Sequence, residues 1–439
     1  MSFTRNSAKI SQRSINMESL LNKIIYQVFI RNYTEEGTLK AFLPHIKEIK
    51  ERTGADILYS MPVNPIGQYR KKGELGCPYS IQDYETINPQ LGSVDDFKEV
   101  VKETHKCGRK FRLDRVFNHT SRDSKLLKEH PDFFYHDKDG NINTKVPEWS
   151  DVYDLDHTNP KVEDYLVGIL AQFVSYGVDG FRFDVGSRIP ASFFAKARKA
   201  LGEEIIFLSE SVDQERINSF RRKGFTARSN GELASGGRNL FYHYNSHRYL
   251  LKYLEDFDPS ELQIYKCRVN LESASIPAST SIVRAIENHD RKRIASYTDS
   301  KKIALNLLAY SFFTKGPSFV YRDGERGQQH TPSLFDKDTV KWANDNETYS
   351  LYKKLVDLKH REANTELYQT ILDQDRSTYI KAVNGFRGGK EEIGLFSLNP
   401  AGVRIPVEKG NYKDLISSKE IISNGNLLVS DPRILVKED

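Results

Sequence analysis

Acids, histidines and an arginine recur in short polar segments, each of which follows a buried apolar run. A single acid in such a place is more often a turn former or a helix cap than a functional group. Capping alone does not explain why acids, histidines and an arginine recur together. Four segments and two further residues carry the pattern: 114–119 (DRVFNH), 180–184 (GFRFD), 207–210 (FLSE), 287–290 (ENHD), Tyr321 and Glu325.

Pairs of carboxylates suggest chemistry at a sugar. Two carboxylates about 5–5.5 Å apart suit a retaining glycosidase, in which one attacks and the other donates a proton. The donor needs a pKa raised by burial or by a neighbouring negative charge. The nucleophile must stay ionised, and Arg182, two residues before Asp184 on the same strand face, would hold that charge. Histidines could donate hydrogen bonds to hydroxyls without adding an anion.

A metal centre is the competing interpretation, because the same segments contain oxygen and imidazole ligands. The possible ligands are Asp114, Asn118, His119, Asp184, Glu210, His289 and Asp290. No H-E-x-x-H motif supports a catalytic zinc, and the two histidines among these possible ligands are not closely spaced.

Buried strands alternate with amphipathic helices over most of the chain. Eight apolar runs predict strands at 24–30, 56–61, 110–117, 180–185, 205–210, 239–244, 281–287 and 317–321. Such an α/β alternation favours a (β/α)₈ TIM barrel, whose active site lies at the carboxyl ends of the strands.

Capping residues set the expected helix ends. Ser93, with Asp96 three residues later, begins a helix that stops at Gly108, and Asn159-Pro160 opens another that stops at Gly177. An earlier helix places Phe42, Ile46 and Ile49 on one face.

Changes in pattern divide the chain into four parts. Residues 1–23 read as a loose polar extension, and 24–118 with 157–363 form the barrel. The polar, turn-rich stretch 119–156 predicts a small excursion over the barrel mouth. After 364, short strands at 378–383, 394–397 and 426–429 predict a small antiparallel β domain.

Composition narrows the classes of function. The net charge of +5 is spread along 439 residues without a run of five like charges, which argues against a nucleic-acid partner. The first 23 residues lack a signal-peptide pattern, and no apolar stretch is long enough to predict a membrane span. Three cysteines are too few for a disulfide framework. We therefore expect a cytoplasmic enzyme.

Taken together, the segments resemble the α-amylase superfamily, glycoside hydrolase family 13. The four segments listed above match its hallmark regions in order. Further matching stretches are 26–32 (YQVFIRN), 61–67 (MPVNPIG), 76–84 (GCPYSIQDY), 149–156 (WSDVYDLD) and 332–336 (PSLFD). The resemblance implies a barrel with a short domain B at 119–156 and a C-terminal β domain.

The resemblance also implies catalytic roles. Asp184 would be the nucleophile, Glu210 the general acid and then the base, and Asp290 the group that grips the hydroxyls of the distorted sugar. Arg182 would orient Asp184, and Asp114 would brace the strand-three loop.

Three more residues are implied to contact the same sugar. His119 and His289 would donate hydrogen bonds, and Tyr79 would stack beneath the ring. The implied substrate is an α-glucan oligosaccharide.

The sequence departs from the family pattern in three places. Many relatives carry Lys-His after the nucleophile, where this chain has Ser187-Arg188. Asn118 matches a calcium ligand of relatives, but the missing histidine argues against calcium, so we expect no required cofactor, with calcium as the alternative. Arg109, Arg112 and Arg115 stand where relatives show apolar residues. In segment 321–325 (YRDGE), relatives often have a glycine two residues after the tyrosine, where this chain has Asp323.

The expected activity is hydrolysis of α-glucosidic bonds in maltodextrin-like chains, with retention. A transglycosylase or an oligo-α-1,6-glucosidase on the same scaffold is the nearest alternative, since water and a sugar hydroxyl compete for one covalent intermediate. Val185 occurs in several 1,6-acting relatives and elsewhere, so it does not decide. A non-catalytic binding scaffold is a third possibility, although all three acids are present.

Overall fold

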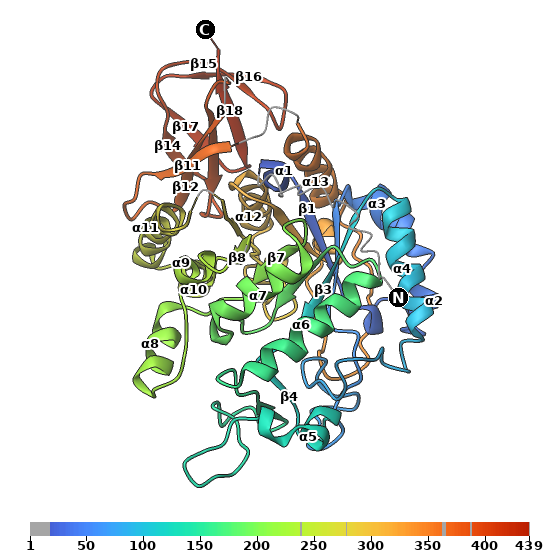
Figure 1. Cartoon of the computed structure of the whole chain (residues 1–439). Coiled ribbons are helices and arrows are strands. Elements are labelled where there is room, and N and C mark those ends of the chain that lie inside the picture. The colour runs from blue at the N-terminus through green and yellow to red at the C-terminus, as the bar shows by residue number, and fades with distance from the viewer. Residues whose placement is uncertain (1–17, 238, 278, 362–365, 387–388, 439) are drawn as a thin grey trace, which may run out of the picture.

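The central sheet is a nearly closed barrel (Figure 1). The computed structural model describes residues 18–237, 239–277, 279–361, 366–386 and 389–438. In this part of the chain eight parallel strands pair in the order β10-β1-β2-β3-β6-β7-β8-β9. Their bounds are β1 Ile24–Val28, β2 Ile57–Ser60, β3 Lys110–Arg115, β6 Gly180–Phe183, β7 Ile206–Ser209, β8 Leu240–Tyr242, β9 Ser281–Val283 and β10 Ser318–Tyr321. Each strand lies in one of the eight predicted apolar runs, which confirms the (β/α)₈ barrel.

Apolar and aromatic side chains fill the interior of the barrel below its mouth. Ile25, Ile57, Tyr59 and Tyr242 belong to one buried cluster, to which the strands contribute alternate residues. Leu20, in the short helix α1 (Glu18–Leu21), joins this cluster. Residues 18–21 therefore differ from the expected loose extension, because an apolar side chain closes the core; residues 1–17 lie outside the described residues.

Helices surround the strands. Their bounds are α2 Leu39–Phe42, α3 His45–Thr53, α4 Val94–Lys106, α6 Pro160–Ser175, α7 Ala191–Leu201, α8 Gln214–Arg222, α9 Asn230–Ala234, α10 Tyr244–Asp256, α11 Pro259–Ser275, α12 Lys301–Phe313 and α13 Asn346–Lys359. The predicted capping box of Ser93 and Asp96 is present on α4, and Asn159 caps α6. The prediction of a single helix through Phe42 and Ile49 was wrong. Two helices, α2 and α3, occupy this stretch, because Pro44 starts a second helix there.

The excursion after β3 has little regular structure. It contains β4 (His119–Ser121), α5 (Lys125–Glu129), the 3₁₀ turn η2 (Pro131–Phe133) and β5 (Val152–Asp154). β4 and β5 pair antiparallel, with His119 opposite Asp154. This excursion lies at one end of the barrel, and the C-terminal sheet lies at the other (Figure 1).

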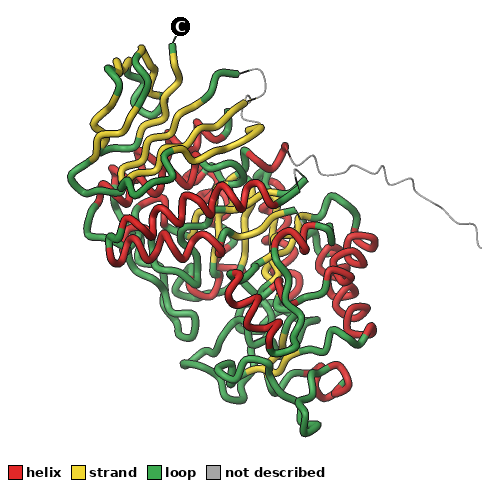
Figure 2. Tube along the Cα trace, turned by 90° about the vertical axis from the view of Figure 1, so that its left-hand side faces the viewer, coloured by secondary structure: helices red, strands yellow, loops and turns green. Residues whose placement is uncertain are grey.

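The C-terminal strands form a separate antiparallel sheet (Figure 2). Its order is β11-β12-β13-β18-β15-β16, and β14 pairs with β17 beside it. The bounds are β11 Glu366–Leu372, β12 Tyr379–Phe386, β13 Glu392–Ser397, β14 Val403–Pro406, β15 Gly410–Asp414, β16 Glu420–Ser423, β17 Asn426–Val429 and β18 Arg433–Lys437. The three strands predicted here are confirmed, while the predicted boundary at 364 lies outside the described residues.

Helix α12 joins this sheet to the barrel. Asn306 on α12 donates to the carbonyl of Ser430 (2.8 Å) and accepts from the backbone N–H of Ser397 (2.9 Å). Phe313 and Phe396 pack with their ring centroids 5.6 Å apart. The barrel and the tail thus share one continuous core.

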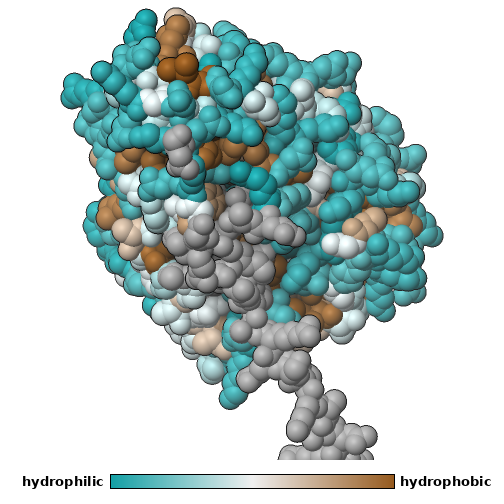
Figure 3. All heavy atoms as spheres, turned by 90° about the horizontal axis from the view of Figure 1, so that it is seen from above, coloured by the Kyte–Doolittle hydropathy of each residue, from teal (hydrophilic) through white to brown (hydrophobic). Residues whose placement is uncertain are grey.

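The face seen from above is largely hydrophilic, with small apolar patches (Figure 3). Two exposed apolar side chains on the tail sheet are Ile422 and Leu428. Among the described residues, none of the helices combines the length and the apolar character that crossing a bilayer requires.

Candidate active site

Three strand ends place acids around one arginine. Arg182 on β6 is fully buried, and its Nη1 lies 2.9 Å from Asp184 Oδ1 while its Nη2 lies 2.9 Å from Glu210 Oε2. Asp290 Oδ2 is 4.0 Å from the same Nη2. The three acids predicted from the sequence therefore converge, and the planar guanidinium fixes two of them next to each other.

Asp114 closes the cluster from below. Its carboxylate accepts from Arg182 Nη1 (2.9 Å), from the hydroxyl of Tyr59 (2.6 Å) and from the hydroxyl of Tyr79 (2.8 Å). Asp114 is wholly buried, and all of these donors come from other elements. It therefore holds the cluster together, which extends the structural role expected at the strand-three loop.

The backbone after Asp184 is strained. Val185 has φ 43°, a left-handed conformation that is uncommon for a β-branched residue. Its N–H donates to Glu210 Oε2 at 2.8 Å. The strained peptide thus holds the predicted proton donor against the backbone that directly follows Asp184.

Asp290 lies at the open side of the cluster. His289 Nε2 is 3.0 Å from Asp290 Oδ2 and 2.6 Å from the Tyr79 hydroxyl. Burial disfavours the charged form of Asp290, but the hydrogen bond from His289 and the positive charge of Arg182 outweigh this effect and lower the pKa of Asp290. Its side chain is 38% exposed, so an ionised carboxylate faces the space in which a sugar would bind.

Gln27 is a site residue that the sequence analysis missed. It is fully buried on β1, and its Nε2 donates to His289 Nδ1 at 2.8 Å. This contact makes Nδ1 an acceptor and leaves the proton on Nε2, facing Asp290 and Tyr79. A polar residue inside the first apolar run was the available signal.

His119 begins β4, and its ring lies against the backbone of Tyr79. Burial lowers its pKa to about 4, and Arg188 adds to this effect while Asp154 opposes it. The Asn118 amide lies 3.0 Å from its Nδ1, so the proton of the neutral ring sits on Nε2. Trp149 packs against the ring, with the centroids 5.1 Å apart. His119 can therefore donate to a hydroxyl without carrying charge.

Tyr79 is tied into the cluster by its hydroxyl. Its ring stacks on His289, with a centroid distance of 5.3 Å and an interplanar angle of 12°. The guanidinium of Arg182 lies 5.5 Å from the centroid of the Tyr79 ring. Stacking of Tyr79 beneath a sugar stays a prediction.

The arrangement argues against a metal centre at the acids. A guanidinium already occupies the position between the carboxylates, and its positive charge would repel a divalent cation there. Among the residues that the structure describes, no group of three or more His, Cys, Asp or Glu side chains is placed to hold a metal ion. The acids instead match a pair that can share one proton.

The pH dependence follows from that pair. Burial and the negative charge of Glu210 raise the pKa of Asp184 well above its ordinary value, against the attraction of Arg182. Because Asp184 must be ionised to attack, we expect activity to be lost as the pH falls through this raised pKa, above an ordinary Asp value of about 3.9. The measurement is kcat/KM against pH on a glycosyl fluoride, whose leaving group needs no proton.

Glu210→Gln removes the neighbouring negative charge in this experiment. The acidic limb should then move to lower pH, since Asp184 loses the repulsion that raises its pKa. An acidic limb at the same pH in both proteins would contradict the coupling.

Comparisons with known proteins agree with this geometry. Residues 23–235 match the family model for the alpha amylase catalytic domain. An α-amylase from Lactobacillus plantarum superposes with a TM-score of 0.87 and 32% identity, covering 96% of this chain and 99% of that one. The chain belongs to the α-amylase family. The resemblance read from the sequence is thereby confirmed.

Two curated relatives match this chain over different shares of their own length. Alpha-amylase 3 of Dictyoglomus thermophilum is 24% identical in an alignment 431 residues long, which covers 81% of this chain and 81% of that protein. The alpha-1,4-glucan:maltose-1-phosphate maltosyltransferase of Myxococcus xanthus is 27% identical over 256 residues, and the chain spans only 38% of that protein.

The strand-three arginines are not part of the α-amylase-type acid cluster. Arg109 Nη2 donates to the carbonyl of Ile46, and Arg115 Nη1 donates to Asn64 Oδ1 at 2.7 Å. The guanidinium of Arg115 also lies 3.5 Å from the ring centroid of Phe173. Arg112 is buried on β3, and its Nε, Nη1 and Nη2 have no hydrogen-bond partner among the residues that the structure describes.

Arg112→Met should stabilise the fold. Burial lowers the pKa of Arg112 to about 10, so near neutral pH its side chain is still a cation in the folded protein. None of the described acids forms an ion pair with it. Replacing it with an apolar side chain of similar length is expected to raise the free energy of unfolding by about 1–3 kcal/mol. Urea unfolding measures this change, and Lys98→Met, at an exposed helix position, is the control. A loss of stability would show that Arg112 has a favourable partner.

The altered strand-eight segment has a structural role. Glu325 is fully buried, and its Oε1 accepts from Arg52 Nε at 2.7 Å and from the Tyr26 hydroxyl at 3.3 Å. Arg322 Nη1 donates to the carbonyl of Asn32 at 2.8 Å. These contacts join β10 to the first βα unit, and they leave the four acids around Arg182 untouched.

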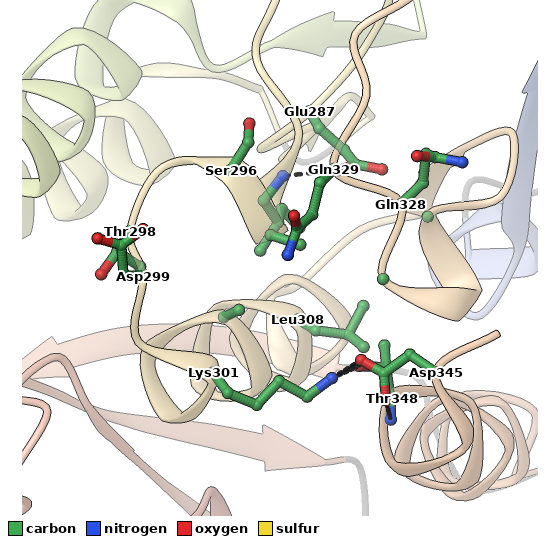
Figure 4. A pocket seen from close by; sticks show the side chains of 15 residues that line it. Glu287, Ser296, Thr298, Asp299, Lys301, Leu308, Gln328, Gln329, Asp345 and Thr348 are labelled. Carbon is green, nitrogen blue, oxygen red and sulfur yellow. Dashed lines mark hydrogen bonds and ion pairs between the residues drawn. The ribbon is translucent and has the colours of Figure 1, made fainter. Parts of the chain in front are cut away.

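A separate cavity of about 360 Å³ lies between η4 (Ile294–Ser296), α12 and η5 (Gly324–Arg326) (Figure 4). Glu287 forms part of its wall, and its Oε2 accepts from the N–H of Ile294 at 2.7 Å. None of the acids that contact Arg182 lines this cavity. Glu287 therefore belongs to this cavity and not to the cluster around Asp290.

Proposed function

We propose that the chain is a retaining glycoside hydrolase that cleaves α-glucosidic bonds in maltodextrin-like chains. The observation that carries this proposal is that Asp184 and Glu210 each lie 2.9 Å from a different terminal nitrogen of Arg182, with Asp290 beside them. Such an arrangement presents a nucleophile and a proton donor to one anomeric carbon.

The first step breaks the glycosidic bond. Glu210 transfers its proton to the glycosidic oxygen while Asp184 attacks the anomeric carbon, so the carbon–oxygen bond breaks as an ester to Asp184 forms. The leaving chain departs with its new hydroxyl. Glu210, now ionised, takes a proton from water, and the water oxygen displaces Asp184 with net retention.

The remaining residues hold the sugar. Asp290 would accept from its hydroxyls, and the imidazole of His289 would share one of these contacts. The neutral His119 would donate from Nε2, and Arg182 keeps Asp184 oriented. These roles rest on the placement of each side chain around the open side of the cluster.

Transfer to a sugar hydroxyl is the second candidate. The similarity to the maltosyltransferase of Myxococcus xanthus favours it, since that protein's name states a transfer reaction. The same ester would then be attacked by a second sugar and not by water. An oligo-α-1,6-glucosidase would follow the same steps as the hydrolase and would differ only in the linkage that it cleaves.

Product sizing on maltooligosaccharides and on an α-1,6-linked trisaccharide tests these proposals. Shorter products from the α-1,4 chains support the hydrolase, longer products support transfer, and cleavage of only the α-1,6 bond supports the oligo-glucosidase. No turnover of any of these sugars, with Asp184→Asn as the blank, would contradict an enzyme and favour a binding scaffold.

We also propose that the protein works in the cytoplasm without a required cofactor. The free cysteines Cys77, Cys107 and Cys267 fit a reducing compartment. Fractionation of cells that express the chain tests this location.

A further inference from the structure

Both carboxylate oxygens of Asp154, at the base of the excursion, accept hydrogen bonds. Its Oδ1 accepts from Asn118 Nδ2 at 3.2 Å, and its Oδ2 accepts from Arg188 Nη2 at 2.6 Å and from the N–H of Lys145 at 2.9 Å. Asp154 is wholly buried. Both oxygens are therefore committed to donors of this chain.

Arg188 brings a positive charge to this point from another part of the barrel. It lies in η3 (Gly186–Arg188), directly after the β6 strand, and its side chain is 2% exposed. Its guanidinium stands 4.6 Å from the ring centroid of Phe220 on α8 and 5.7 Å from that of Trp149 in the excursion. One side chain thus links three segments that are distant in sequence.

The donors present do not fit the calcium that the family resemblance implies near Asn118. Calcium needs six to eight oxygen ligands at about 2.3–2.6 Å. Here the amide nitrogen of Asn118 faces two acceptors, Asp154 Oδ1 and His119 Nδ1. Asn118 therefore presents its amide nitrogen to Asp154, and not the amide oxygen that a calcium ion would need. The guanidinium on Asp154 would also repel a second cation.

We propose that Arg188 is a built-in cation that replaces calcium in joining the excursion to the barrel. A buried arginine–carboxylate pair with further hydrogen bonds gives a fixed bridge, and removing one partner leaves a buried charge unpaired. Because His119 lies opposite Asp154 in the β4–β5 ladder, the bridge also fixes the strand that carries His119. The chain then keeps this region ordered without a metal.

The bridge is independent of whether the chain hydrolyses or transfers, so it is tested by stability. Thermal unfolding of the full chain is measured in EDTA and in millimolar calcium chloride. The Tm is expected to agree within about 1 °C, and Arg188→Met is expected to lower it by about 5 °C. Arg122→Met is the matched control, because Arg122 lies in the same excursion, stacks on Tyr153 at 4.4 Å and forms no ion pair in the described structure.

Two outcomes would overturn the proposal. One is a Tm that rises by several degrees in calcium for the unaltered chain. The other is an Arg188→Met protein as stable as Arg122→Met. If Arg188→Met does not fold, Arg188→Lys takes its place, and it should unfold below the unaltered chain but without any stabilisation by calcium.

Discussion

Asp184→Asn is expected to lower kcat on maltooligosaccharides on the order of 10⁴-fold or more. An amide cannot form the ester, and its oxygen is a far weaker nucleophile than a carboxylate. Arg182 would lose one of its charged partners but keep Asp114 and Glu210. Steady-state release of reducing ends measures the change.

The fold should survive this substitution. Asn has the shape of Asp and can still accept from Arg182 Nη1, so circular dichroism and Tm should change little. Asp164→Asn is the control, because Asp164 is an exposed acid that pairs with Lys196 away from the cluster. An Asp184→Asn protein that retains more than a few per cent of the activity would remove Asp184 as the nucleophile.

Glu210→Gln is expected to lower kcat/KM on maltooligosaccharides by about 10²–10⁴-fold. A sugar leaving group is a poor one, and without a proton donor it departs as an alkoxide. The loss should be within about tenfold when the leaving group is fluoride, since this group needs no proton. The ratio of the two losses therefore measures proton donation separately from binding.

The control for this variant is Glu215→Gln. Glu215 is a largely exposed glutamate on α8 that pairs with Arg248. The Glu215→Gln substitution should leave kcat/KM unchanged on both substrates. Equal losses of Glu210→Gln on both substrates would show that Glu210 orients the site and donates no proton.

The barrel strands could be predicted because each is a short apolar run bounded by turn residues. The acids were also predictable, since Asp184, Glu210 and Asp290 follow such runs, and the carboxyl ends of parallel strands meet at one rim. Helices with a side-chain cap, such as α4 and α6, were placed by the same local chemistry.

Contacts between distant segments could not be predicted in this way. Gln27, Tyr59 and Arg188 act through partners that lie far away in sequence, and nothing in their own neighbourhood indicates the partner. The strain at Val185 likewise depends on how the peptide is held against Glu210. Pro44, by contrast, was a local signal that divides the predicted first helix.

In the tail, alternation was too weak to define every strand. β15 and β18 pair within a sheet whose residues alternate between buried and exposed over only a few positions. Tyr412 of β15 and Leu435 of β18 lie in one buried cluster of this domain, and this long-range packing sets their register. The strands with the clearest apolar runs, β12, β13 and β17, were the ones that the sequence indicated.

Trapping the covalent intermediate tests the convergence of the acids most directly. Glu210→Gln is incubated with α-maltosyl fluoride, so that the ester forms without a proton donor and is hydrolysed slowly. Peptide mapping by mass spectrometry should find one maltosyl group on Asp184, and the released sugar should keep the α configuration. A sugar attached to another residue, or a product of inverted configuration, would contradict the assignment of Asp184 as the nucleophile.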